Sequence, residues 1–285
     1  MRKIHFTTGL FATLFFGVLF VNLALTKTAD DATFDANPYL VSELPFEIGE
    51  RLIFRLRYGF ISAGKAEMKV LGLKNNDYGN YYHIQTTARS TRTFDWVFKV
   101  RDVVNSYMNA KTLHPIHFEK LLREGNYKAD TFVDYFYEDS IARVKYLRYK
   151  DGMKIKKREE YEVKIPPTGV FDALSAFYYI RTLDLNGIDT LYVPAHEKKK
   201  VYNLPIAISG PEIVTVKAGK FRCWRLEPAL MEEGIFKHEG KLTIWLTDDN
   251  LKIPVQMKTK VLVGHITAEL IEIKGISKKI PAKLN

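Results

Sequence analysis

One helix-forming segment stands in a chain whose other patterns are those of strands and turns. Residues 166–185, PPTGVFDALSAFYYIRTLDL, open with two prolines, which end a preceding strand because proline donates no hydrogen bond to a sheet. Asp172 can cap a helix by accepting hydrogen bonds from its first N–H groups. The spacing of one helical face then connects Leu174, Phe177, Tyr178 and Arg181. We therefore predict one principal α-helix at about 170–184.

Arg181 is the unusual member of that helical face, because an unpaired buried charge is very costly. Two interpretations stay open. The guanidinium group forms a structural ion pair or bonds to backbone carbonyls, or it binds an anion at the end of a cavity, for which its planar fork is suited.

Strand patterns with regularly spaced turns fill the remainder of the chain. Residues 47–58 alternate in the period of two that a half-buried strand requires, and turn-rich segments such as 75–80 and 124–126 separate later strands. No repeat or linker divides the chain at the helix. We predict a mainly β fold: a single curved antiparallel sheet, or a half-barrel or barrel, of many strands with the helix packed against it. This β-rich domain spans residues 46–274.

The N-terminus has the layout of an export signal. Arg2 and Lys3 precede an uncharged stretch at 4–26. We predict a signal peptide at residues 1–28, with an uncleaved signal anchor as the alternative, followed by a flexible leader at 29–45. Residues 275–285 form a basic tail that we expect to fray. These features predict that the rest of the protein lies outside the cytoplasm.

Charge and cysteine content limit the classes of partner. The chain has 43 Lys and Arg against 33 Asp and Glu, a net charge of +10. Such an excess favours anionic lipid headgroups, lipopolysaccharide or acidic polymers, and for an exported protein we expect no nucleic acid. The single cysteine, Cys223, excludes an intramolecular disulfide and is interpreted as a buried, unreactive thiol.

No group of residues predicts a catalytic site, a metal site or a cofactor. Asp248 and Asp249 precede an asparagine and indicate a hairpin turn. His114 and His117 are separated by a proline, and in a strand their spacing would place them on opposite faces. A hydrolase would require acids to converge on a titratable partner in a cleft, and the acids considered are Asp102, Glu119, Glu124 and Asp172.

Aromatic residues crowd the first half of the chain, including Trp96 in the ambiguous segment 93–97. They fill the core, or they line an apolar cavity if the curved sheet is too wide to fill itself. For the second interpretation, the candidate ligand-binding residues are Arg181, Tyr178, Phe177, Arg101 and Trp96.

Several short motifs occur together between about residues 46 and 273. They include GERL at 49–52, VRD at 100–102, LHP at 113–115, FDALSAFYYIR at 171–181, GKLTIWLTDD at 240–249 and IPV at 253–255. Through these motifs the chain resembles a family of uncharacterised bacterial exported proteins, DUF3108. The resemblance implies an extracytoplasmic β-rich protein, which we expect in the bacterial periplasm, and supplies neither an activity nor catalytic residues. A looser similarity, of architecture only, connects it to half-barrel carriers of lipoproteins in the bacterial envelope.

These observations favour a non-enzymatic envelope protein that binds an apolar or amphipathic ligand, such as lipid or a lipopolysaccharide-like molecule, in a curved sheet. The alternative is a structural or assembly factor that binds another envelope protein, and a hydrolase of an envelope polymer is less favoured. Membrane contact would come through an uncleaved N-terminal segment or through surface charge.

Overall fold

The computed structural model describes residues 43–77, 79–229, 242–260 and 264–284. The predicted export signal and most of the predicted leader lie outside these residues. The described strands are β1 Arg51–Tyr58, β2 Ile61–Asn76, β3 Gly79–Ser90, β4 Arg101–Asn109, β5 Pro115–Glu124, β6 Tyr127–Phe136, β7 Ile141–Tyr149, β8 Ile155–Lys164, β9 Thr190–Glu197, β10 Lys200–Val216, β11 Gly219–Pro228, β12 Leu242–Thr247, β13 Pro254–Lys260, β14 His265–Lys274 and β15 Lys283–Leu284. The helices are α2 Arg92–Asp95, α3 Ala173–Arg181 and a 3₁₀ turn, η1 Asp151–Met153.

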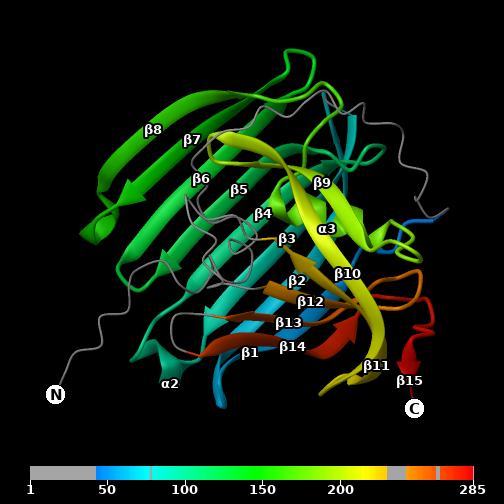
Figure 1. Ribbon diagram of the computed structural model, residues 1–285. Helices are drawn as coiled ribbons and strands as arrows, with labels where there is room; N and C mark the ends of the chain where they lie inside the picture. Colours follow the sequence, from blue (N-terminus) through cyan, green and yellow to red (C-terminus); the bar gives the residue numbers. More distant parts are fainter. Residues whose placement is uncertain (1–42, 78, 230–241, 261–263, 285) are drawn as a thin grey trace.

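All fifteen described strands belong to one antiparallel sheet, drawn in Figure 1. The order is β8-β7-β6-β5-β4-β3-β2-β1-β14-β13-β12-β11-β10-β9, with β15 added beside β11. Pairing of β1 with β14 joins the two halves of the chain. The sheet curls but its end strands, β8 and β9, do not pair, so it is not closed into a barrel. The predicted mainly β fold with a single curved sheet is confirmed.

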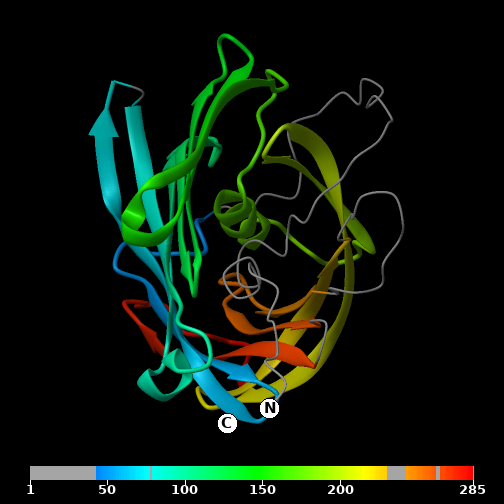
Figure 2. The ribbon, with the colours of Figure 1, turned by 90° about the vertical axis from the view of Figure 1, so that its left-hand side faces the viewer.

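Helix α3 lies inside the curve of the sheet, as Figure 2 shows. The prediction of a helix within 170–184, capped by Asp172, is confirmed: the Asp172 carboxylate accepts hydrogen bonds from Leu174 N and Ser175 N. The burial of the helix is wider than one face, because only Tyr179 among its nine residues is not buried. Sheet residues meet the helix on several sides, and the interior around it is filled by side chains.

Three local features add detail that the sequence left open or interpreted differently. Residues 200–216 form the single strand β10, which continues through a cis Gly210–Pro211 bond. The ambiguous segment at 93–97 overlaps the short helix α2, Arg92–Asp95, in which Phe94 is buried. The C-terminal tail packs on the sheet rather than fraying, because β15 pairs with β11 and Ala282 is buried.

Candidate binding site on the concave face

The three predicted site residues on α3 lie in the core. Arg181 is fully buried and its guanidinium group donates two hydrogen bonds to Glu50, at 2.7 Å to Oε1 and 2.8 Å to Oε2. It also donates to the backbone oxygens of Pro45 and Leu251. The structural interpretation of Arg181 is therefore the one observed. Tyr178 and Phe177 are buried beside it, with the Arg181 guanidinium carbon 5.0 Å from the centre of the Tyr178 ring.

The other two predicted site residues lie at one end of the sheet, near α2. Arg101 is bound to Asp95 through two hydrogen bonds, the shorter of 2.6 Å. Trp96 follows α2 and is 91% exposed. The structure thus does not gather the five predicted residues at one place, and their role in ligand binding stays a prediction.

On strands β5 to β8, the concave face changes from an apolar row of side chains to a polar row. Directly opposed residues of an antiparallel pair project from the same side of the sheet, so each cross-strand row has one orientation. The row next to α3 is mostly apolar and consists of Phe118, Val133, Val144 and Tyr161. The adjacent row, further from the helix, is polar and consists of Lys120, Thr131, Tyr146 and Glu159. The apolar row belongs to the core that also contains α3, and the polar row, whose residues are half-buried, is the candidate site.

We call this region the concave polar site and define it by Lys120, Tyr127, Tyr146, Arg148, Tyr161, Glu197 and Lys199. The Tyr127 and Tyr146 hydroxyls are 3.3 Å apart, and Arg148 lies over the Tyr127 ring at 3.8 Å. The turn between β9 and β10 completes the site from the opposite side, since Lys199 Nζ is 5.0 Å from the centre of the Tyr161 ring. Cations and tyrosine hydroxyls thus project into one concave region.

Burial perturbs several ionisable groups at or beside this site. It raises the pKa of Glu197 to about 7, although Lys120 and Lys198 oppose the shift. Burial likewise lowers the pKa of Lys120. Asp102, on β4, is 2% exposed, and burial together with the nearby charge of Glu124 raises its pKa to about 8. Because Asp102 is then mostly protonated at neutral pH, cations outweigh anions around the site. Perturbed groups in one place mark a functional candidate.

The four acids considered for a hydrolase do not all converge. Glu119 lies on the convex face, where it contacts His117 and Asn105. Asp172 is engaged in capping α3 and accepts a hydrogen bond from the Ser106 hydroxyl. Asp102 and Glu124 do lie close enough for their charges to interact, but both are buried away from solvent. This arrangement offers no exposed acid pair to a polymer.

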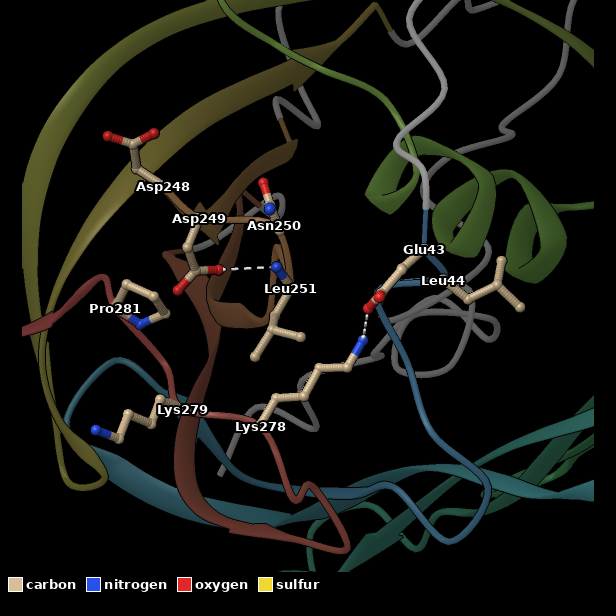
Figure 3. A pocket seen from close by; sticks show the side chains of 9 residues that line it. All are labelled: Glu43, Leu44, Asp248, Asp249, Asn250, Leu251, Lys278, Lys279 and Pro281. Atoms are coloured by element: carbon tan, nitrogen blue, oxygen red, sulfur yellow. Dashed lines mark hydrogen bonds and ion pairs between the residues drawn. The ribbon is translucent and has the colours of Figure 1, made fainter.

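The remaining sequence candidates have structural roles. The Asp248–Asp249 pair forms a turn, as predicted: Asp249 accepts hydrogen bonds from Leu251 N and Lys252 N, and Asp248 pairs with Arg222. The turn borders an open pocket of about 610 Å³, drawn in Figure 3, with the Glu43–Lys278 ion pair on its other side. Cys223 is buried, which raises its pKa to about 12, as expected of an unreactive thiol.

The histidines and the acids form no metal cluster in the described part of the chain. His117 lies on the convex face, 2.6 Å from Asp134, whereas His114 packs against Phe171 inside. The concave polar site itself was not identified from the sequence. The signal that could have indicated it is the alternation within β7, where the apolar inward positions Ala142 and Val144 give way to Tyr146 and Arg148.

The model of the family "Protein of unknown function (DUF3108)" matches residues 53–271. The chain belongs to this family. The match extends through both halves of the sheet and through α3, which agrees with the single continuous sheet. The curated proteins gave no match.

Solved structures with a similar fold include several bacterial proteins. A β-barrel-like protein of the domain-of-unknown-function family DUF1849 from Brucella abortus has a TM-score of 0.52 at 11% identity, covering 81% of this chain and 98% of that one. A candidate lipoprotein from Parabacteroides distasonis has a TM-score of 0.37 at 12% identity over 80% of this chain and 96% of that one. A candidate exported protein from Bacteroides fragilis, with a YmcC-like fold, has a TM-score of 0.34 at 10% identity, over 83% and 99%. The first of these likenesses supports the fold.

Among the described residues, no helix combines the length and the apolar character needed to cross a membrane.

Proposed function

We propose that this protein is a non-enzymatic extracytoplasmic binding protein that holds an anionic, amphipathic ligand, such as a lipid or a lipopolysaccharide-like molecule, in the concave polar site. The observation that carries the proposal is the boundary between the apolar row, which joins the core around α3, and the polar row beside it. An amphipathic molecule is the ligand class that matches such a boundary.

The positive charge of the concave polar site favours a ligand with an anionic headgroup. In the described part of the chain, neither Lys120 nor Arg148 forms an ion pair with a carboxylate, although both project into the concave face. A phosphate or carboxylate of a ligand would compensate these cations through charge-assisted hydrogen bonds. The rings of Tyr127, Tyr146 and Tyr161 offer flat surfaces for a sugar or for the start of an acyl chain. The pattern of residues 1–28 supports a periplasmic location.

The test is native mass spectrometry of the full chain, purified gently from the exported fraction. We expect a retained ligand with an anionic headgroup, and we expect the double variant Lys120→Gln, Arg148→Gln to lose it. Each charged hydrogen bond contributes about 1.5–3 kcal/mol, so affinity should fall by at least roughly tenfold per residue.

The matched control is Arg143→Gln, Lys145→Gln. These cations are exposed on the opposite face of β7, and the variant carries the same loss of charge. Retention of the ligand by the control and its loss from the Lys120/Arg148 variant support the site. If the wild-type chain retains no lipid and binds none when anionic lipid is added in detergent micelles, the proposal is wrong.

An assembly factor that pairs a partner strand with the sheet is less well supported. The open edge strand β8, IKKREEYEVK, is dense in charge, a feature that discourages pairing with another chain.

A further inference from the structure

Large apolar side chains protrude from two connections of the sheet. Phe60, in the turn from β1 to β2, is 97% exposed, and Ile61, the first residue of β2, is 59% exposed. In the connection that contains α2, Trp96 is 91% exposed and Val97 is 60% exposed. Single exposed apolar residues are ordinary on protein surfaces, but two neighbouring connections that each expose a pair of large apolar side chains are typical of an interaction site.

The two connections lie side by side at one end of the sheet. Gly64 of β2 is paired with Ser90 of β3, and Thr91 N donates a hydrogen bond to Ala63 O at 2.9 Å, directly before α2. Figures 1 and 2 both show α2 and the β1–β2 turn at the lower end of the molecule. We call Phe60, Ile61, Trp96 and Val97 the apolar tips.

Contacts within the connection that contains α2 hold Trp96 and Val97 outward. Phe94 is buried, and its backbone N–H donates to the Thr91 hydroxyl that caps α2. Arg101 binds Asp95 within the same connection. Because these contacts fix α2 against the sheet, Trp96 and Val97 point into solvent from a defined structure.

The surroundings of the apolar tips are strongly basic. Residues 57–66 and 89–101 contain six Lys or Arg, of which Arg101 pairs with Asp95 and Arg57 pairs with Glu269 of β14. The exposed cations are Lys65, Arg89, Arg92 and Lys99. Lysine and arginine beside a membrane are attracted to anionic headgroups, whereas tryptophan and other apolar side chains enter the interface.

We propose that this end of the sheet docks on the surface of a bilayer that contains anionic lipid, with the apolar tips inserted at headgroup depth. Lipid fits better than a protein partner because the apolar groups protrude at separate turns whose segments also carry these exposed cations. The proposal does not rest on the concave polar site. If both hold, the sites are neighbours, since Gly125, after β5, donates a hydrogen bond to Lys99 O next to α2.

The test is sedimentation of the full chain with vesicles of phosphatidylcholine, with and without phosphatidylglycerol. We expect binding to the anionic vesicles. In a variant with Trp224→Phe and Trp245→Phe, which leaves Trp96 as the only tryptophan, brominated lipids should quench the fluorescence. This readout separates docking through the tips from attachment by the N-terminal segment alone, which would leave Trp96 unquenched.

Two pairs of variants complete the experiment. Each cation near an anionic surface contributes about 1 kcal/mol, so Lys65→Gln, Arg92→Gln, Lys99→Gln should reduce partitioning roughly 100-fold. The charge-matched control changes Lys145, Lys156 and Lys164 to Gln, on exposed positions of β7 and β8.

Phe60→Ser with Trp96→Ser should also weaken binding, whereas Tyr192→Ser with Ile213→Ser, also exposed but on β9 and β10, should not. The proposal is overturned if Trp96 stays unquenched on bound vesicles, if each variant partitions like its control, or if this end captures a protein but no lipid.

Discussion

At the scale of single residues, the buried Arg181–Glu50 pair is the feature on which the core depends most. Both side chains are fully buried, and the guanidinium group has four acceptors in Glu50, Pro45 and Leu251. Breaking a buried pair by removal of one partner costs about 3–5 kcal/mol, because the other charge stays buried without compensation. We predict that Arg181→Met lowers the free energy of unfolding by this amount, measured by urea denaturation.

The control for that prediction is Arg51→Gln, one residue after Glu50. Arg51 pairs with Glu67 at 2.8 Å, but its side chain is 42% exposed, so its loss should cost less than about 1 kcal/mol. Equal effects of Arg181→Met and Arg51→Gln would contradict the importance of the buried pair.

A second residue-scale prediction concerns pH. Burial and the nearby Glu124 raise the pKa of Asp102 from 3.8 to about 8, and its Oδ2 has no hydrogen-bond partner in the described structure. Since the folded state binds the proton more tightly than the unfolded state, this contribution to stability is complete below about pH 4 and is lost as the pH rises towards 8. We predict that Asp102→Asn loses less stability than wild type between about pH 5 and pH 8.

Thermal unfolding at both pH values measures this difference. Asparagine can still accept the hydrogen bond that Arg123 N donates to Asp102 Oδ1 at 2.6 Å, so the substitution removes the titration and keeps that contact. Parallel pH profiles for the two proteins would show that Asp102 does not titrate in this range.

At the scale of elements, the start of α3 is fastened to the sheet through Asp172. One carboxylate oxygen accepts from Leu174 N and Ser175 N at 2.7 and 2.9 Å, and the other accepts from the Ser106 hydroxyl of β4 at 2.6 Å. An ordinary cap contributes about 1 kcal/mol. We predict a larger loss, about 2 kcal/mol or more, for Asp172→Ala, because the Ser106 hydroxyl is then left buried and unsatisfied.

Urea denaturation measures that loss, and Asp184→Ala is the matched control. Asp184 is exposed after the helix and bonds only locally, to Asn186. The variant Asp172→Asn should lie between the two, since an amide oxygen can keep the cap. A loss for Asp172→Ala no larger than that for Asp184→Ala would refute the fastening role.

At the scale of the whole molecule, the two ends of the described chain close the structure around the helix. Strand β1 pairs with β14, Glu47 accepts hydrogen bonds from Ser277, and β15 extends the sheet beside β11. The continuous sheet therefore bends around α3 from both sides (Figures 1 and 2). The concave polar site and the end of the sheet that carries the apolar tips are the two surfaces to which we assign function.

Most strands and turns, the principal helix and its Asp172 cap could be predicted from the sequence, because periodicity and capping involve residues close in the chain. The sequence motifs also indicated the family. The folded structure was needed to show that Glu50, 131 residues from Arg181, neutralises the guanidinium group. It was also needed to show which side chains lie together in the polar row, and that the connection containing Trp96 lies beside the β1–β2 turn. These contacts join residues distant in the chain, and no local pattern encodes which of the many possible partners meet.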